Sequence, residues 1–175
     1  MSDDLKLVLS PEDINRRVSE LAAEISQDLG ARDLVLVGIL KGAFIFLSDL
    51  ARQMTCSCYL EFVRVASYGA STESSGNIEL TKAPEMELAG HDVVVVEDIV
   101  DTGLTVRWLK DYLAELGCRR VRVCALIDKP ERRKVDLELD YVGFRVPKGF
   151  LVGYGLDYNE QYRYLPGVYE IVRQG

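Results

Sequence analysis

Histidine is almost absent from this sequence: His91 is the only one among 175 residues. A serine–histidine catalytic pair and a zinc site built on several histidines are therefore not serious candidates. His91 itself stands in Ala89-Gly90-His91-Asp92, before a hydrophobic run, where a surface turn residue is expected. Any catalytic chemistry must come from other side chains.

Cysteine is also scarce, and the four cysteines are poorly spaced for zinc. Cys56 and Cys58 are closer together than in a Cys-x-x-Cys zinc site, and Cys118 and Cys124 are separated by five residues. We predict buried, reduced thiols, because cysteine is among the most buried residue types.

Long apolar runs and an excess of basic residues are missing as well. No stretch approaches the roughly 18 consecutive apolar residues that a membrane helix needs. The opening Met-Ser-Asp-Asp-Leu-Lys lacks the basic and then apolar layout of a signal peptide, so a cytoplasmic protein is expected. The net charge of −7 argues against general nucleic-acid binding, which relies on a basic face. It does not argue against a phosphate ligand, because a site can be locally basic in an acidic protein.

Residues 93–105 are the most informative stretch. Four valines predict a buried central strand, which is followed by Glu97, Asp98 and Asp101. Thr102-Gly103-Leu104-Thr105 then opens a segment with helical spacing. In open α/β sheets ligands bind beyond the carboxyl ends of strands, and a helix N-terminus offers N–H groups to an anion. Because carboxylates there can bind a sugar diol or hold Mg²⁺, the pattern indicates a phosphorylated sugar as ligand.

Elsewhere the hydrophobic pattern alternates between strands and helices. Ser10-Pro11-Glu12-Asp13 is typical of a helix start, and Gly30 of a helix end. The apolar face of this helix is predicted to comprise Ile14, Val18, Leu21, Ala22, Ile25 and Leu29. Further helices are expected at 43–53 and 104–116, the latter with Trp108, Leu109, Tyr112, Leu113 and Leu116 on one side. Strands are expected at 34–40, 58–66 and 121–127, with shorter ones within 141–154 and 168–172.

This alternation predicts an α/β fold with a mainly parallel sheet flanked by helices and a small flap from the terminal segments. No repeat or shift in composition marks a second domain, so residues 1–175 are expected to form one. The polar run from Ser67 to Asn77 lies between two strand-like stretches and is either a lid or an idle surface loop. Tyr68 is the residue best able to close over a ligand.

The nine residues from Glu97 to Thr105, Glu-Asp-Ile-Val-Asp-Thr-Gly-Leu-Thr, resemble the phosphoribosyl pyrophosphate motif of the type I phosphoribosyltransferases. The resemblance extends over nearly the whole chain and is closest to the hypoxanthine-guanine branch. It implies the type I phosphoribosyltransferase fold, with a central sheet and a small hood from the terminal segments. It also implies a homodimeric or homotetrameric purine salvage enzyme that uses phosphoribosyl pyrophosphate, a 6-oxopurine base and Mg²⁺.

The resemblance assigns roles to the residues of the motif. The 5′-phosphate would rest on Thr102, Gly103, Leu104 and Thr105, with Leu104 standing where some relatives carry lysine. Asp101 would act as general base near N7 of the purine. Glu97 and Asp98 would serve the ribose and the metal, and Ser67 and Tyr68 would begin a loop that closes over the reaction centre.

Four further stretches carry the resemblance. Leu40-Lys41-Gly42 resembles the pyrophosphate loop with its non-proline cis peptide. Lys129 would face the exocyclic oxygen of the purine. Phe150 would stack on the base, and the backbone of Leu151 would read its edge. Asp157 would hold a second Mg²⁺ through waters, and Arg163 would grip the pyrophosphate.

Other interpretations stay open at this stage. Taken alone, Lys41 and Lys129 are more typical of solvated lysines, and Phe150 of a core residue. The choice among hypoxanthine, guanine and xanthine depends on a few backbone contacts that the sequence does not reveal. An RNA-binding regulator on the same fold would need a basic stripe, which a pI near 4.8 opposes. A phospho-acceptor signalling domain would explain the acids but not the Thr-Gly-Leu-Thr loop.

Overall fold

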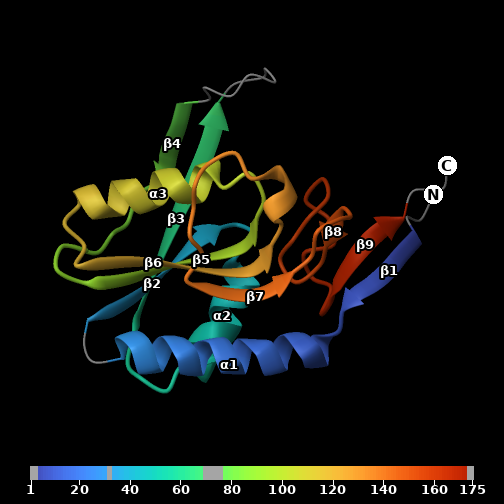
Figure 1. Cartoon of the computed structure of the whole chain (residues 1–175), viewed down its shortest axis with the longest axis horizontal. Helices are drawn as coiled ribbons and strands as arrows, with labels where there is room; N and C mark the ends of the chain where they lie inside the picture. Colours follow the sequence, from blue (N-terminus) through green and yellow to red (C-terminus); the bar gives the residue numbers. More distant parts are fainter. Residues whose placement is uncertain (1–3, 31–32, 69–76, 173–175) are drawn as a thin grey trace.

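The computed structural model describes residues 4–30, 33–68 and 77–172, which form two β-sheets and the helices that cover them (Figure 1). The main sheet consists of β2 (Leu34–Leu40), β3 (Tyr59–Tyr68), β4 (Asn77–Lys82), β5 (Asp92–Val100), β6 (Arg120–Asp128) and β7 (Tyr141–Arg145). The second sheet consists of β1 (Asp4–Leu9), β8 (Leu151–Val152) and β9 (Val168–Val172). The helices are α1 (Pro11–Leu29), α2 (Phe44–Gln53), α3 (Leu104–Glu115) and the short 3₁₀-helix η1 (Pro130–Arg132).

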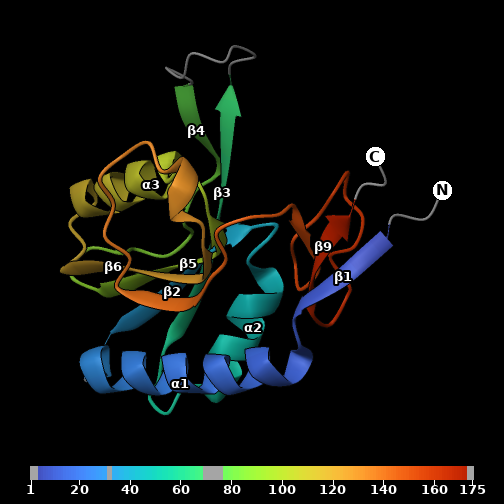
Figure 2. The same ribbon diagram turned by 45° about the vertical axis from the view of Figure 1, so that its right-hand side comes forward.

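The main sheet has the order β4-β3-β2-β5-β6-β7 and is parallel except at β4, which pairs antiparallel with β3. The predicted mainly parallel sheet is therefore confirmed. In the second sheet, β1 and β8 each pair antiparallel with β9. The expected hood of terminal segments is thus present, and Figure 2 shows it beside the start of α1.

The central strands β2 and β5 of the main sheet bury both of their faces. Alternate residues of β2 enter different cores, since Leu34 and Leu36 pack on one side and Val35 and Val37 on the other. The first core lies under α1 and α2, and the second lies under α3, so the helices cover opposite faces (Figure 1). Strands buried on both faces read as continuous apolar runs, which is the pattern of residues 34–40 and 93–96.

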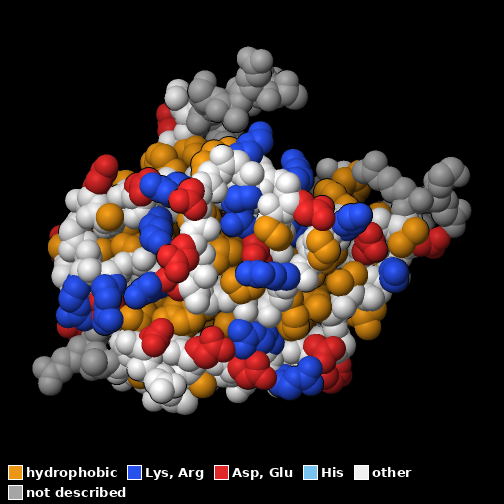
Figure 3. Space-filling model, in the orientation of Figure 1, with side chains coloured by type: hydrophobic (Ala, Val, Ile, Leu, Met, Phe, Trp, Pro, Cys, Tyr) orange, Lys and Arg blue, Asp and Glu red, His pale blue; other side chains and the backbone are white. Residues whose placement is uncertain are grey.

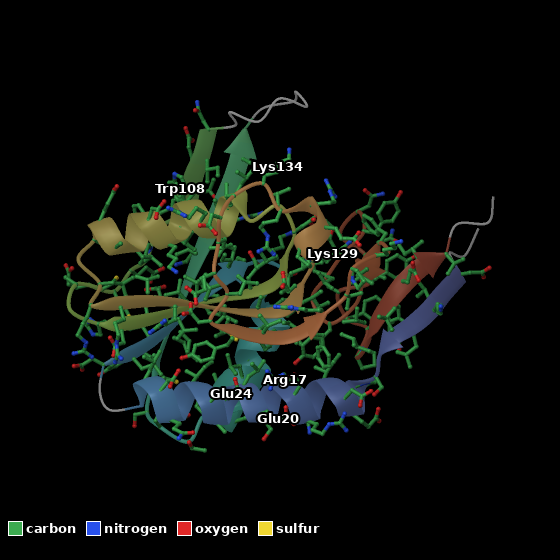
Figure 4. All side chains as sticks on the ribbon, viewed as in Figure 1. Arg17, Glu20, Glu24, Trp108, Lys129 and Lys134 are labelled. Atoms are coloured by element: carbon green, nitrogen blue, oxygen red, sulfur yellow. The ribbon has the colours of Figure 1, made fainter. Side chains whose placement is uncertain are left out.

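Helix α1 forms as the sequence predicts. The Ser10 hydroxyl accepts a hydrogen bond from the N–H of Asp13 at 3.1 Å, and Pro11 occupies the first turn. All six residues of the predicted apolar face are buried. On its outer side, Arg17 pairs with Glu20 and Glu24 (Figure 4). The same guanidinium donates to the carbonyls of β7 at Val142 and Gly143, which ties the helix to the edge of the sheet.

Some boundaries differ from those expected. Strand β5 continues to Val100, so Glu97 and Asp98 lie within its last residues and not beyond it. Their backbone is held by pairing with β6, which lets polar residues remain in strand conformation. The stretch 141–154 holds two separate strands, β7 and β8. In α3 the expectation for Leu116 was wrong: it is 39% exposed, and the buried residue that was missed is Val106 at the other end.

The cysteines are free, as predicted. Only Cys124 is fully buried, whereas Cys56, Cys58 and Cys118 are half-buried.

His91 lies in a turn before β5, at the opposite end of that strand from the acidic residues. Across the described ranges, no helix has the length and apolar character needed to cross a membrane.

Asp92 is a buried charge that fixes the amino ends of the central strands. It is 1% exposed and accepts hydrogen bonds from the guanidiniums of Arg119 and Arg120, at 2.9 Å and 3.0 Å from their Nε atoms. Its N–H donates to Asp33 just before β2. The two arginines hold the pKa of the Asp92 carboxyl well below its usual range. The ion pairs of Asp92 with the two arginines thus stabilise the fold at pH values above about 3.9, the pKa of the unfolded carboxyl. This stabilisation is lost as the pH falls from that value through the lowered pKa of the folded state.

We predict that Asp92→Asn lowers the free energy of unfolding at pH 7 by about 2 kcal/mol, less than for a fully buried pair because both guanidiniums are about half exposed. Urea denaturation at pH 7 and pH 3 measures the effect, and the deficit of the variant should shrink at pH 3, where the native carboxyl begins to lose its advantage. Asp111→Asn, which breaks an exposed pair with Arg107, should change stability by about 0.5 kcal/mol or less. Equal losses in the two variants would contradict the role assigned to Asp92.

Candidate functional site

The candidate site lies at the carboxyl ends of the parallel strands. Strands β2, β5 and β6 end at Leu40, Val100 and Asp128, all on one edge of the main sheet. The hood of β1, β8 and β9 stands on the same side (Figures 1 and 2). Loops from both sheets therefore meet there, where open α/β sheets bind their ligands.

Glu97 and Asp98 form a buried pair of adjacent carboxylates at the end of β5, 9% and 8% exposed. The Glu97 carboxylate accepts the N–H of Asp98 at 3.1 Å, and the Asp98 carboxylate accepts the N–H of Ile99 at 2.8 Å. Burial, followed by the charge of Asp98, raises the pKa of Glu97. Burial also raises the pKa of Asp98, although its hydrogen bonds and the charge of Arg163 oppose the rise. Because burial disfavours the ionised forms of Glu97 and Asp98, a cation or a hydrogen-bond donor beside them would stabilise those forms.

The loop after β2 packs directly against this pair. The Leu40–Lys41 peptide is cis, as the resemblance implies. A Cβ added at Gly42 would overlap the Asp98 carboxylate, and one added at Gly155 would overlap the Gly42 carbonyl. Gly155 also has a φ of 97°, in the region that favours glycine. Two glycines thus let the backbones of two loops approach the acidic end of β5.

Lys41 and Arg163 meet at one exposed carboxylate. Lys41 Nζ lies 2.7 Å from Glu160 Oε2, and Arg163 Nη2 lies 3.2 Å from Glu160 Oε1. Arg163 Nη2 also lies 3.1 Å from Asp157 Oδ1, while Nη1 donates to the carbonyl of Gly155 at 2.7 Å. Lys41 and Arg163, the two cations that the resemblance assigns to the pyrophosphate, are therefore side by side, and Asp157 lies beside Arg163.

The loop from Asp101 to Thr105 surrounds a cavity of about 180 Å³, whose lining also includes Glu97 and Val106. Gly103, with a φ of 81°, precedes the first residue of α3, so the loop lies at a helix N-terminus. Arg133 Nε donates to the Asp101 carbonyl, and Lys134 N to the Thr102 carbonyl. The segment that follows β6 thus holds the loop in place.

The Asp101 carboxylate has one paired oxygen and one unpaired oxygen. Oδ2 accepts a hydrogen bond from Arg132 at 3.0 Å. Oδ1 is buried and has no hydrogen-bond partner within the described part of the chain. A buried oxygen without a partner is costly, which marks the place where a ligand N–H would be accepted.

Lys129, Phe150 and Leu151 come together between the main sheet and the hood. Lys129 Nζ donates to the carbonyl of Gly149 at 2.8 Å, directly before Phe150. Figure 4 labels Lys129 on the side of the main sheet that faces β8 and β9. Phe150 is 51% exposed and meets Tyr158 edge-on, with ring centroids 5.4 Å apart. It is not a core residue, and a half-exposed ring offers a free apolar face for stacking.

Ser67 makes no contact with this cluster among the described residues, and the side chain of Tyr68 lies outside what the structure describes. Both belong to the end of β3, and Tyr68 pairs with Asn77 of β4. The lid expected between Ser67 and Asn77 falls mostly outside the described residues. Within the described ranges no three acidic, cysteine or histidine side chains are close enough to form a metal cluster, so Glu97, Asp98 and Asp157 do not share one.

The sequence analysis missed the partners of the site residues. Arg132 and Arg133 contact Asp101, and Glu160 joins Lys41 to Arg163. The basic run 132–134, three residues after Lys129, was a signal for the first two. No local signal pointed to Glu160, because its contact with Lys41 spans 119 residues of sequence.

The comparisons with known proteins described below all identify phosphoribosyltransferases. The family model for the phosphoribosyl transferase domain matches residues 8–159. The chain is 49% identical over 168 residues to a hypoxanthine-guanine phosphoribosyltransferase of Aquifex aeolicus, covering 95% of this chain and 94% of that one. A Bacillus subtilis enzyme of the same name is 40% identical over 92% of this chain and 89% of its own. A hypoxanthine-guanine phosphoribosyltransferase of Bacillus anthracis, solved with a HEPES molecule in its active site, superposes with a TM-score of 0.92 at 41% identity. That superposition covers 97% of this chain and 100% of the other.

We predict that Gly42→Ala destabilises the protein by about 2 kcal/mol, because the new methyl group has to displace the buried Asp98 carboxylate. Urea denaturation measures the change. Gly90→Ala is the matched control: its φ is 78°, but nothing lies near the added methyl, so it should lose only about 1 kcal/mol from backbone strain. A Gly42→Ala protein as stable as the native one would show that Asp98 is not confined by this loop.

Proposed function

This chain belongs to the phosphoribosyl transferase domain family, and from that membership we propose that it transfers the 5-phosphoribosyl group of phosphoribosyl pyrophosphate to hypoxanthine or guanine. The products are IMP or GMP and pyrophosphate. The protein is accordingly a pentosyltransferase of purine salvage, built as one domain. A cytoplasmic location and assembly into a homodimer or homotetramer remain predictions.

The observation that carries this proposal is the cavity that Glu97, one of the two buried acids, shares with the Asp101–Thr105 loop. The loop, at the N-terminus of α3, suits a 5′-phosphate through its N–H groups and hydroxyls. Leu104 adds no charge, so the phosphate depends on backbone donors. The acidic pair suits the ribose hydroxyls beside it, since carboxylates accept hydrogen bonds from a diol.

Family membership also implies a divalent metal ion, which we propose to be Mg²⁺. The residues fit it: Mg²⁺ usually takes one or two protein carboxylates and completes its shell with water and substrate phosphates. Glu97 and Asp98, whose pKa values are raised by burial, and the separate Asp157 are the candidate ligands. When bound, the ion would neutralise charge on the leaving pyrophosphate. Lys41 and Arg163 would bind the same leaving group as donors.

The purine would lie between Lys129 and Phe150. Lys129 already donates to a carbonyl, at Gly149, so its ammonium is oriented toward an oxygen acceptor. Because ammonium only donates, it accommodates a 6-oxo group and would leave the 6-amino group of adenine unpaired. Phe150 would stack on the ring, the backbone of Leu151 would read its edge, and Asp101 would take or share the proton that the ring loses at N7.

Two other candidate functions remain to be tested. Within the family, a xanthine-preferring enzyme would use the same residues. An RNA-binding regulator would need one basic stripe, and the face in Figure 3 instead shows acidic and basic side chains intermixed. A turnover assay with phosphoribosyl pyrophosphate, Mg²⁺ and each purine base separates these functions. Nucleotide formed from no base would refute the proposal, and tight RNA binding would favour the regulator.

Asp101→Asn is predicted to reduce turnover by ~10²-fold or more, the usual contribution of a placed acid–base group. The amide can still accept a hydrogen bond from Arg132 but cannot take a proton. Steady-state rates at saturating substrates measure the loss, with Asp111→Asn as the control that removes an exposed carboxylate from α3. Full activity of Asp101→Asn would exclude Asp101 as the base.

Lys129→Ala is predicted to raise the KM for hypoxanthine by about tenfold or more, since a charged hydrogen bond to the base is lost. The KM for phosphoribosyl pyrophosphate should change much less, because Lys129 lies at the base side of the site. Lys6→Ala, on β1 of the hood, removes an exposed lysine and should change neither constant. Equal losses for both substrates would contradict the assignment of Lys129 to the purine.

A further inference from the structure

The proposed function assigns Lys41 and Arg163 to the pyrophosphate, and in the structure both already bind another anion, Glu160. We propose that the Glu160 carboxylate occupies the place of the pyrophosphate in the free enzyme and withdraws when pyrophosphate or its phosphoribosyl ester binds. This inference rests on the proposed function and adds to it a residue that controls affinity for the leaving group.

The contacts of Glu160 are those of a bridging anion. Its two carboxylate oxygens are divided between the two cations, Oε2 at 2.7 Å from Lys41 and Oε1 at 3.2 Å from Arg163. Hydrogen bonds from Lys41 and then from Arg163 lower the pKa of Glu160, so it is ionised at neutral pH. A phosphate group presents oxygens to two donors in the same manner.

Glu160 cannot keep both contacts once pyrophosphate has bound. The carboxylate and the phosphate oxygens compete for the same N–H donors, and like charges within a few ångströms repel each other. Arg163 shows that further donor capacity is present, since its Nε is buried and without a partner among the described residues. Its guanidinium is only 19% exposed and is held by Asp157 and Gly155, so the arginine stays in place while the carboxylate leaves.

The carboxylate can leave at little cost. The Glu160 side chain is 63% exposed, and Lys41 is 46% exposed, so water replaces the broken contacts at once. Its backbone is held separately, by a hydrogen bond from the Glu160 N–H to Asp157 at 2.8 Å. The side chain therefore moves without the turn. When pyrophosphate departs, the same carboxylate is positioned to pair with Lys41 and Arg163 again, which favours product release.

The test is calorimetric titration of the full chain with magnesium pyrophosphate, comparing native protein with Glu160→Gln. The glutamine has the same shape and a single neutral acceptor, so the competing charge is gone while the turn is kept. We expect the Kd for pyrophosphate to fall about three- to tenfold, the range set by two exposed ion pairs. Glu115→Gln, which removes an exposed carboxylate from the far end of α3, should bind as the native protein does.

A second titration, with GMP, tells the inference apart from the proposed function. The nucleotide uses the phosphate loop and the base site, so its Kd should be the same in native protein and Glu160→Gln, which also shows that the variant is folded. Pyrophosphate binding that is unchanged or weaker in Glu160→Gln, with GMP binding intact, overturns the inference and leaves the proposed function standing. Native protein that binds neither ligand overturns both.

Discussion

The site depends on two carboxylates buried side by side at the end of the central strand. Burial opposes the ionisation of Glu97 and Asp98 and raises both pKa values. For Asp98 the rise is opposed by its hydrogen bond with Glu97, by backbone N–H groups and by the charge of Arg163. Ionised acids in such a place need positive charge from outside the strand. The loops around them are arranged accordingly: glycines at 42 and 155 let backbone approach closely, and two cations lie beyond. In the proposed function, a magnesium-bound, phosphorylated sugar would supply the positive charge and the hydrogen-bond donors that these acids need.

The site is divided between the two sheets. The main sheet and the segments that follow its strands provide the acids, the Asp101–Thr105 loop and Lys129. Phe150 lies directly before β8, Leu151 lies in β8, and Asp157 and Arg163 lie in the turns after it. The candidate site therefore lies at a boundary between packed elements, where the backbone is irregular. Gly153, Gly155 and several non-glycine residues near them have positive φ values, which is typical of such functional turns.

Local patterns account for what could be predicted from the sequence. The cap at Ser10, the apolar face of α1 and the all-apolar β2 involve neighbours a few residues apart, so periodicity reveals them. The position of the Asp101–Thr105 loop could likewise be predicted, because the strand, its acidic residues and the start of the helix are consecutive in the sequence. Contacts between residues far apart in the sequence could not be predicted in this way. The Arg132–Asp101 pair spans 31 residues and the Lys41–Glu160 pair spans 119. The basic run 132–134 was a signal for the first pair, whereas no local pattern indicates that Glu160 contacts Lys41. The end of β5 was misplaced because pairing with β6 outweighs the polarity of Glu97 and Asp98.

The position of β9 in the middle of the hood also bears on how the protein is made. Strands β1 and β8 both pair with β9, so the first strand to be synthesised has no strand partner until residues 168–172 exist. The surface that carries Phe150 and Leu151 cannot be completed on a growing chain. If Phe150 and Leu151 bind the purine as proposed, a ribosome that has finished the main sheet would still hold an incomplete base site, and β9 would complete it.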